Sequence, residues 1–275
     1  MSWISAIIVT NNSGPDLDRC LAALRGQTLP VAEIIVVDSG SADSGQVRSL
    51  CARENIHCMC TDNVGFGRAN NLGYRAASAK ADFILFINPD AFVSTTAIQN
   101  CLECMSEPSG EGIGCLTGRL LGFDREKGKA TGYLDSTGIF RKWYGRWYDR
   151  GHGEQERGQY DWRQDVPAAC GAFMFCRRVA LEQVVLSDGA VFDPDFFLYK
   201  EDIELSLRLR KYHWRIVYVP SVIVYHCRGW RQRRQMPRRQ RMLAVQNEVR
   251  LYLKHPSMYL LWAIAKYCLV RYINV

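Results

Sequence analysis

Two adjacent acids, Glu201 and Asp202, stand at the start of a segment whose apolar residues have helical spacing. The residues before them, 192–199, include many large apolar side chains, which could place an acid in a partly dry pocket as a general base. The alternative is structural, because acids at the N-terminus of a helix are stabilised by its dipole. The residues alone leave both interpretations open.

Another acid, Asp90, directly follows the apolar run 83–87 in the sequence Asn88-Pro89-Asp90. A carboxylate here could bind Mg²⁺ or Mn²⁺, which take one or two protein carboxylates and complete their coordination with phosphate and water. Asn-Pro and Pro-Asp are also common turn pairs. His226 ends a later apolar run and is either a structural histidine or a ligand of the same cation.

Polar pairs follow the first two apolar runs of the chain. Thr10 and Asn11 follow the run 3–9, and Asp38 and Ser39 follow the run 33–37. Each pair could bind a base or ribose, or could cap the helix that comes next.

A glycine-rich turn at 63–71, with Asn63, Gly67 and Asn70, opens a further helix. Backbone N–H groups in such a turn can contact a diphosphate. Asn70 occupies the third glycine position of G-x-G-x-x-G, so the motif disfavours the alternative of a nicotinamide-binding domain.

The elements that must position these residues alternate along the first 90 residues. The patterns predict strands over 3–9, 33–38, 56–60 and 82–87 and helices over 16–24, 44–54 and 67–79. This alternation is typical of a mostly parallel sheet flanked by helices. Ligands bind beyond the carboxyl ends of such strands, so the polar clusters should meet at one edge of the sheet.

The pattern is lost from 119 to 165, a stretch rich in glycine, aromatic and charged residues that is either a floppy excursion or a binding wall. Trp143 and Trp147 in it could stack on an acceptor sugar or form a small aromatic core. After it we expect a strand over 169–176, a helix over 177–186, and a hairpin-like pair over 214–219 and 222–226.

Together these motifs resemble the family 2 glycosyltransferases of the GT-A fold, in particular the rhamnosyltransferase-like branch. The resemblance runs from Ile4 to about Gly229, and its segments are 7–11, 36–41, 63–71, 88–90, 170–174, 196–202 and His226. Asn88 stands where the family usually has the first acid of Asp-x-Asp, a departure that the rhamnosyltransferase-like members share.

The resemblance implies a role for each motif. Donor binding would fall to Thr10, Asn11, Asp38, Ser39, Asn63, Gly67, Asn70, Asn88 and Asp90. Asp90 and His226 would bind the divalent cation, Mg²⁺ or Mn²⁺. Asp202 would deprotonate the acceptor hydroxyl with help from Glu201, and Gly171, Ala172, Trp143 and Trp147 would contact the acceptor.

The net charge of +7 comes from the tail, where seven arginines fall within residues 228–241. Such a run suits anionic lipid headgroups or nucleic acid. Nucleic-acid binding is the rival function, but it leaves the acidic and glycine-rich clusters unexplained. The apolar stretch 258–270 is shorter than the roughly 18 residues of a membrane span, so we expect it to pack on the body or to lie in a membrane interface.

These features predict a GT-A α/β domain over 1–227, with a donor half to about 118 and an acceptor half after it, and a basic helical appendage over 228–275. The cysteines are irregularly spaced, and the lone C-x-x-C of Cys101 and Cys104 falls short of the two pairs, or pair with nearby histidines, that a zinc site needs. This spacing and a start without a basic leader favour the cytosol. We therefore expect an inverting transferase peripheral at the inner face of the plasma membrane. Its donor would be dTDP-L-rhamnose, with UDP-hexoses open, and its acceptor a lipid-linked saccharide of O-antigen or polysaccharide assembly.

Overall fold

The structure, a computed structural model, describes residues 2–228 and 236–273. Gly229, Val275 and three arginines of the predicted basic run (Arg231, Arg233 and Arg234) lie outside the described residues.

The N-terminal half alternates strands and helices as predicted, and its strands are parallel. Strands β1 (Ile4–Thr10), β2 (Glu33–Ser39), β3 (His57–Thr61) and β4 (Phe83–Ile87) lie side by side in the order β4-β1-β2-β3. The helices between them are α1 (Gly14–Arg25), α2 (Ser44–Arg53) and α3 (Phe66–Ala76). The α/β class expected from the sequence is confirmed.

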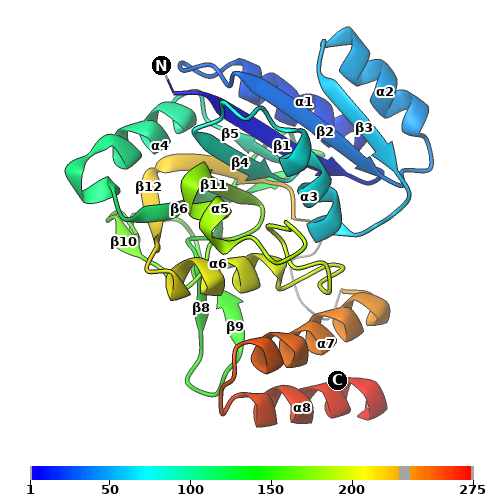
Figure 1. Ribbon diagram of the computed structural model, residues 1–275, viewed down its shortest axis with the longest axis vertical. Helices are drawn as coiled ribbons and strands as arrows, with labels where there is room; N and C mark the ends of the chain where they lie inside the picture. The colour runs from blue at the N-terminus through cyan, green and yellow to red at the C-terminus, as the bar shows by residue number, and fades with distance from the viewer. Residues whose placement is uncertain (1, 229–235, 274–275) are drawn as a thin grey trace.

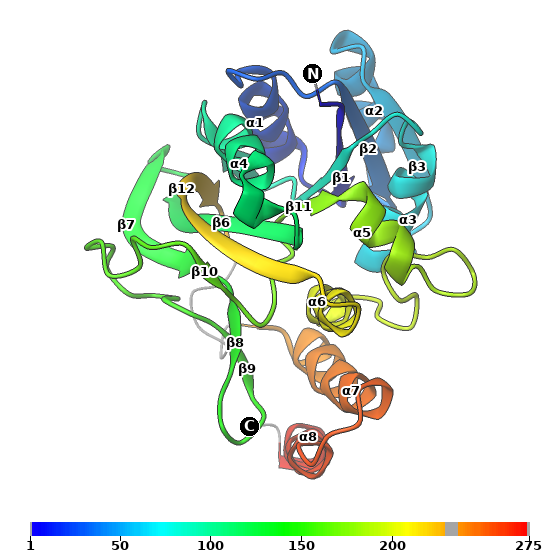
Figure 2. The same cartoon turned by 60° about the vertical axis from the view of Figure 1, so that its left-hand side comes forward.

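Strands β1 and β4 are buried throughout and β2 over most of its length because helices cover the sheet on both sides (Figure 2), whereas the edge strand β3 is mostly half-buried. Along β1, Ile4, Ala6 and Ile8 contribute to the core under α1, α2 and α4 (Ala97–Ser106), while Ile7 and Val9 point to the core under α3. This alternation explains why the strand is a continuous apolar run.

Antiparallel strands join the second half of the chain to the same ten-stranded sheet of the described residues. Strand β11 (Phe173–Arg177) lies between β4 and β6 (Ile113–Asp124), and it leads into α5 (Arg178–Val184) and then α6 (Glu201–Lys211). The strand predicted over 169–176 therefore starts only at Phe173.

The expected hairpin over 214–226 is wrong. The segment is one long strand, β12 (Arg215–His226), which pairs in parallel with β6 on both sides of an irregularity between Val219 and Ile223. Pro220, which has no N–H to donate, lies in that irregularity and breaks the ladder without reversing the chain.

The stretch 119–165 is neither a floppy excursion nor irregular throughout. It completes β6 and then forms β7 (Lys129–Ser136), the hairpin of β8 (Ile139–Arg141) and β9 (Trp147–Asp149), and β10 (Gln164–Asp165). Glycines with positive φ at its turns (Gly128, Gly132, Gly138, Gly145 and Gly151) interrupt the periodicity that would reveal the strands. Two short elements complete the body: β5 (Ala91–Val93), paired with β12, and the 3₁₀ turn η1 (Pro108–Gly110).

The tail forms two packed helices, α7 (Arg238–Lys254) and α8 (Leu260–Cys268), followed by the π-helical turn η3 (Leu269–Ile273). Helix α7 lies beside α6, and α8 lies outside α7 at the end of the molecule where the β8–β9 hairpin also ends (Figures 1 and 2). No helix of the described residues has the length and apolar character needed to cross a membrane.

Candidate active site

The carboxyl ends of β1 and β2 bring Thr10 and Asp38 into register. One oxygen of Asp38 accepts a hydrogen bond from the backbone N–H of Ser41 at 3.0 Å. The other oxygen, Oδ2, and the Thr10 Oγ1 are buried without a hydrogen-bond partner among the described residues. The N-cap of α2 is Asp43, so Asp38 does not cap that helix. Buried polar atoms normally have partners, and a polar ligand at this edge would supply them.

Asn11 and the glycine-rich turn build the rim of this edge. The Asn11 Nδ2 donates to the carbonyl of Ser39 at 2.8 Å. Gly65, with φ of +86°, opens α3, and Asn63 Oδ1 accepts from its N–H at 3.3 Å. Asn70 donates from Nδ2 to the carbonyl of Phe66 at 3.0 Å. A Cβ on Gly67 would lie 3.3 Å from the Phe192 Cβ, so this glycine permits close packing.

The expected pairing of Asp90 with His226 is present, because β5 pairs with the end of β12. The His226 Nε2 lies 3.4 Å from the Asp90 Oδ1. Its Nδ1 contacts the Asp135 Oδ2 at 2.7 Å. Asp135 ends β7, is only 3% exposed, and is held in turn by the guanidinium of Arg228, whose Nε lies 2.6 Å from its Oδ1. An acid that binds the far nitrogen of a histidine fixes the ring and directs the other nitrogen outward.

The charges of this cluster support one another. Burial disfavours the charged imidazole, but the carboxylates of Asp90 and Asp135 outweigh it and raise the pKa of His226 to about 10. Burial likewise opposes ionisation of Asp135, yet Arg228 and His226 hold its pKa well below the usual range. Burial also opposes ionisation of Asp90, but His226 and Arg125 outweigh it and lower the pKa of this carboxyl.

The donor atoms at this point fit a divalent cation only in part. Asp90 offers a carboxylate, whereas His226 can offer Nε2 only after this nitrogen loses its proton, because a charged imidazole has no free lone pair. The buried Asn88 Oδ1 has no hydrogen-bond partner among the described residues. No group of three or more His, Cys, Asp or Glu side chains suited to a metal occurs in the described part of the chain. A cation here would therefore rely on phosphate and water for its remaining ligands, as Mg²⁺ and Mn²⁺ commonly do.

The acids predicted as the catalytic pair begin α6. The Asp202 Oδ2 accepts from the Gly171 N–H at 2.9 Å, and its Oδ1 accepts from the N–H of Ile203 at 2.8 Å. Glu201 is 6% exposed, and its Oε2 is buried without a hydrogen-bond partner among the described residues. The acids are therefore oriented differently, and only Asp202 is held by backbone donors.

Their electrostatics differ accordingly. Burial, and then the charge of Asp202, raise the pKa of Glu201 to about 8. Burial also raises the pKa of Asp202, but the N–H groups of Gly171 and Ile203 stabilise its charged form. The pair thus favours a protonated Glu201 beside an ionised Asp202 at neutral pH, which leaves Asp202 able to accept a proton.

A strained turn precedes these acids and is held by the tail. Tyr199 and Lys200 both have left-handed backbones, with φ of 73° and 77°. Asn247 of α7, fully buried, donates from Nδ2 to the carbonyls of Leu198 and Tyr199, both at 2.9 Å. Helix α7 is therefore part of the framework of the site.

A pocket of about 690 Å³ connects the Asp90–His226 cluster with the two acids that begin α6. Its lining includes these predicted site residues: Asn88, Asp90, Trp147, Gly171, Ala172, Glu201, Asp202 and His226. Trp143 is outside the lining and 85% exposed at the tip of the β8–β9 hairpin. The predicted nucleotide-side residues Thr10, Asn11, Asp38, Ser39, Asn63, Gly67 and Asn70 also lie outside the lining.

Several residues of the site could not be inferred from the sequence. Asp135, Arg228 and Asn247 act on the site through contacts with residues far away in the chain. Glu248 and Lys266, from α7 and α8, form an ion pair and line the pocket. None of them lies in a motif, and only the apolar periodicity of 242–253 indicated that α7 would pack against something.

Solved structures share this fold at low sequence identity. The structure "GalNAc-T7 with UDP, GalNAc and Mn2+" matches with a TM-score of 0.67 and 17% identity, over 92% of this chain and 48% of that chain. A mannosyltransferase from Pyrobaculum calidifontis in complex with GDP-Man and Mn2+ matches with a TM-score of 0.58 and 17% identity, over 92% of this chain and 63% of that chain. The present chain thus spans about half the length of the first and less than two thirds of the second. The fold of the chain is therefore the GT-A fold.

Residues 5–185 match the family model "Glycosyl transferase family 2", and the chain belongs to that family. Residues 128–274 also match the model "Glycosyl transferase family group 2". Among curated relatives, the N-acetylglucosaminyl-diphospho-decaprenol L-rhamnosyltransferase of Mycobacterium tuberculosis is 29% identical over 238 residues, 81% of this chain and 75% of the relative. The O-antigen chain rhamnosyltransferase RfbN of Salmonella typhimurium is 34% identical over 108 residues, 38% of this chain and 34% of the relative.

Proposed function

We propose that this glycosyltransferase moves L-rhamnose from dTDP-L-rhamnose to a hydroxyl of a lipid-linked saccharide, with inversion, in cell-surface polysaccharide or O-antigen assembly. The observation that carries the proposal is the single pocket lined by Asp90 and His226 together with Glu201 and Asp202. The curated relatives named above support the sugar and the lipid-linked acceptor.

The side chains of the pocket would divide the work. Asp202, held by the N–H groups of Gly171 and Ile203, would take the proton of the acceptor hydroxyl. The protonated Glu201 would donate a hydrogen bond to the acceptor or to Asp202. A divalent cation bound by Asp90 and His226 would stabilise the charge of the leaving diphosphate. Because no carboxylate is assigned as a covalent nucleophile, one displacement inverts the anomeric centre.

The donor base would occupy the edge formed by Thr10 and Asp38. Both residues offer buried oxygens that have no partner among the described residues, and either could accept a hydrogen bond from the N–H of a pyrimidine. Asn11, Ser39, Asn63, Gly67 and Asn70 would border the ribose and diphosphate. We place the enzyme at the inner face of the plasma membrane, where a lipid-linked acceptor would be available to a cytoplasmic nucleotide sugar.

The test is a transfer assay with a synthetic lipid-linked acceptor and a panel of dTDP-rhamnose, UDP-glucose and UDP-N-acetylglucosamine, each with Mn²⁺, Mg²⁺ or EDTA. We expect transfer from dTDP-rhamnose only with a cation, and proton NMR of the product should show inversion. Transfer only from a UDP-hexose would overturn the rhamnose assignment, and retention would overturn the single displacement. Binding of none of the nucleotides, in a thermal-shift assay of the same panel, would contradict the transferase site itself.

A further inference from the structure

Helix α8 turns an apolar face away from the protein. Along α8 and its flanking residues, Tyr259, Trp262, Ala263, Lys266 and Val270 recur at helical spacing, are buried or half-buried, and face α7 and the β8–β9 hairpin. The exposed residues of 258–272 are uncharged and mostly apolar except Arg271 near the C-terminal end: Met258, Leu261, Ile264, Ala265, Cys268, Leu269 and Tyr272. Leu261 is 77% exposed and Met258 81% exposed. A helix at the surface of a soluble protein normally presents the reverse pattern.

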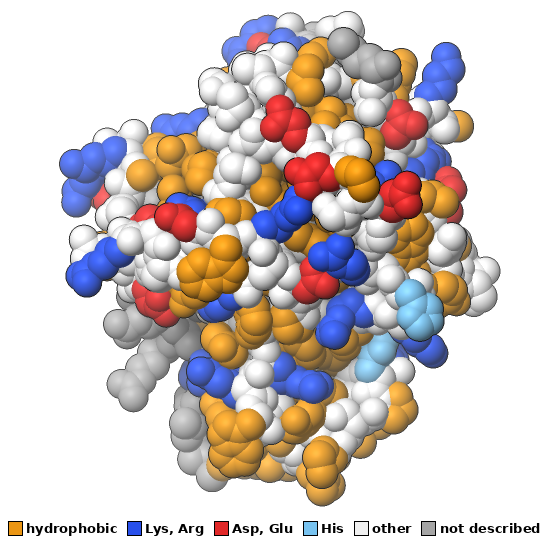
Figure 3. All heavy atoms as spheres, turned by 90° about the vertical axis from the view of Figure 1, so that its left-hand side faces the viewer, with side chains coloured by type: hydrophobic (Ala, Val, Ile, Leu, Met, Phe, Trp, Pro, Cys, Tyr) orange, Lys and Arg blue, Asp and Glu red, His pale blue; other side chains and the backbone are white. Residues whose placement is uncertain are grey.

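The exposed Trp143 continues this apolar surface at the tip of the β8–β9 hairpin. Next to it, Tyr144 packs edge to face on Trp262 of α8 with ring centroids 5.1 Å apart. Hydrophobic side chains accordingly gather at the end of the molecule where the hairpin and α8 meet (Figure 3). An exposed tryptophan beside an apolar helix face suits the interfacial layer of a bilayer.

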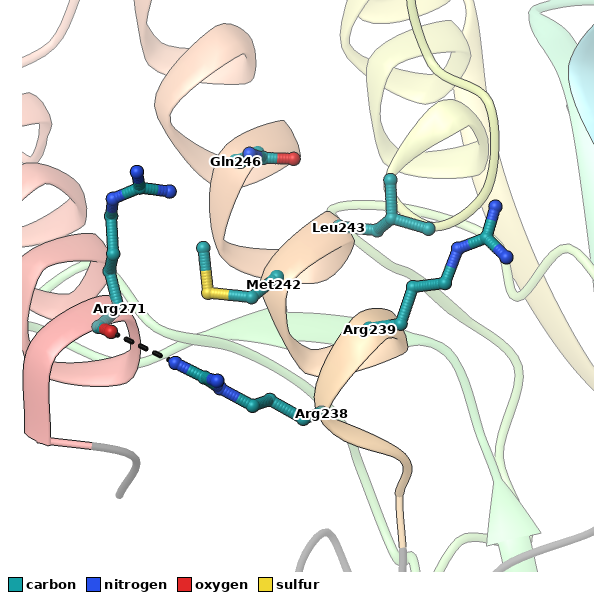
Figure 4. A pocket seen from close by; sticks show the side chains of 6 residues that line it. All are labelled: Arg238, Arg239, Met242, Leu243, Gln246 and Arg271. Atoms are coloured by element: carbon teal, nitrogen blue, oxygen red, sulfur yellow. Dashed lines mark hydrogen bonds between the residues drawn. The ribbon is translucent and has the colours of Figure 1, made fainter.

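At the other end of α8, a groove of about 460 Å³ lies between α7 and η3 (Figure 4). Three arginines line it together with the apolar side chains of Met242 and Leu243: Arg238, Arg239 and Arg271. The Arg238 Nη2 donates to the carbonyl of Arg271 at 3.1 Å, which ties the two helical ends together. Within the described part of the chain, none of the three guanidinium groups forms an ion pair with a carboxylate.

We infer that this groove binds the phosphate of an anionic lipid whose acyl chains lie along the exposed face of α8. The Arg238 and Arg271 guanidinium groups lie on one side of α7 and supply the charge and the hydrogen-bond donors that a phosphate needs, while Arg239 extends on the other side and adds positive charge (Figure 4). The apolar side chains of Met242 and Leu243 suit the glycerol and first methylenes of the lipid. The outward face of α8 and Trp143 then enter the interface, while the groove anchors the headgroup.

This arrangement also explains how the membrane and the active site communicate. Lys266 lies on the inner side of α8 and lines the active-site pocket, whereas Leu261 and Ile264 of the same helix face outward. One helix, about 10 to 12 Å in diameter with its side chains, thus separates the pocket from the docked surface. A saccharide on a lipid carrier would have to pass α8 to enter that pocket, and this step alone depends on the proposed function.

The test is flotation of the full chain with vesicles of phosphatidylcholine alone or with added phosphatidylglycerol, at low and high salt. The variant replaces Arg238, Arg239 and Arg271 with alanine. A matched control removes three exposed basic residues elsewhere, Arg75, Arg210 and Lys211. At about 1 kcal/mol per arginine, and 1.4 kcal/mol per tenfold change, the groove variant should bind anionic vesicles about 100-fold more weakly. The control variant should bind like the wild type.

Equal losses in the groove variant and the control would overturn the site, because they would show that only overall charge matters. A thermal-shift assay with inorganic phosphate and with soluble dihexanoyl-phosphatidylglycerol separates the two sources of phosphate. We expect stabilisation by the short-chain lipid well beyond that by phosphate at equal concentration, and equal stabilisation would reject the lipid. Flotation needs neither donor nor acceptor. Loss of vesicle binding with sugar transfer to a soluble acceptor intact would contradict the lipid site alone, and vesicle binding without sugar transfer would contradict the proposed function alone.

Discussion

Replacing Asn247 with leucine removes the hydrogen-bonding group that holds the turn before Glu201 while keeping the branched shape and the number of heavy atoms of the side chain. In the native chain its Nδ2 donates to the carbonyls of Leu198 and Tyr199, both at 2.9 Å, and its Oδ1 accepts from the Arg250 Nη1 at 2.8 Å. The two residues that follow Leu198 are left-handed and are not glycine. The substitution therefore tests whether the tail positions the catalytic pair.

The backbone strain of the turn and the hydrogen bonds of Asn247 have similar energies. A left-handed conformation costs about 1 to 2 kcal/mol per residue, so Tyr199 and Lys200 together store about 2 to 4 kcal/mol. Each hydrogen bond from Asn247 contributes about 1 kcal/mol, and a buried carbonyl left without a donor costs about as much again. We expect the turn to relax in Asn247→Leu, and the free energy of unfolding to fall by about 2 kcal/mol. A shift of about 1 Å in the start of α6 would lower kcat about 100-fold.

The assay is steady-state rhamnosyl transfer at a temperature where urea titration shows both proteins to be folded. The control is Asn100→Leu on α4. It removes a half-buried asparagine whose Nδ2 donates to the carbonyl of Ser221 at 2.6 Å. We expect the control to lose about 1 kcal/mol of stability and to keep its kcat. A wild-type kcat in folded Asn247→Leu would refute the positioning role of α7.

Three further changes address the pocket directly. Asp202→Asn should lower kcat by about 100-fold to 10,000-fold while dTDP binding, followed by thermal shift, stays unchanged; weakened dTDP binding would argue against a role as base. Because the folded pKa of Glu201 is raised from 4.5 to about 8, its stabilising contribution is full below pH 4.5 and lost as the pH rises to 8. Urea titrations should therefore show stability falling more steeply from pH 5 to 8 in the wild type than in Glu201→Gln, and equal slopes would exclude a buried neutral acid. With Mn²⁺ present, dTDP at 100 times its dissociation constant should stabilise the chain by about 2.7 kcal/mol. Asp90→Ala should abolish the part of this stabilisation that needs Mn²⁺, whereas Asp18→Ala, at an exposed position, should not. Equal stabilisation of the two variants would show that Asp90 does not bind the cation.

Strand and helix periodicity predicted the N-terminal half well because β1, β2 and β4 are largely buried on both faces and each helix buries one face. The run of β1 is uniformly apolar for that reason, and α1 shows its inner face in Leu17, Leu21 and Leu24. The polar residues that end those strands were predictable from topology, since parallel strands share a carboxyl edge. Asp90 and His226 were brought together by a pairing of β5 with β12 that no local pattern indicates.

Residues 119–165 were harder to predict because most of their strands are short and lie at a sheet edge or in a hairpin. The first five residues of β7 are exposed or half-buried and include a glycine, so the segment has no buried apolar residue until Leu134. Asp135 then looks like an ordinary loop acid, although it is buried against His226 and Arg228. In β12, Pro220 and Ser221 have the composition of a turn, but parallel pairing with β6 on both sides keeps the strand in one direction.

Helices α7 and α8 border both the active-site pocket and the proposed membrane-binding surface. Through Asn247, α7 fixes the turn before α6, and through Glu248 and Lys266 the two tail helices close one side of the pocket. The opposite side of α8 carries the apolar face, with the arginine groove at its end. A force on α8 from the membrane would therefore be transmitted to the Lys266–Glu248 pair in the pocket wall. For this reason we expect anionic vesicles to change kcat with a soluble acceptor as well as KM with a lipid-linked one.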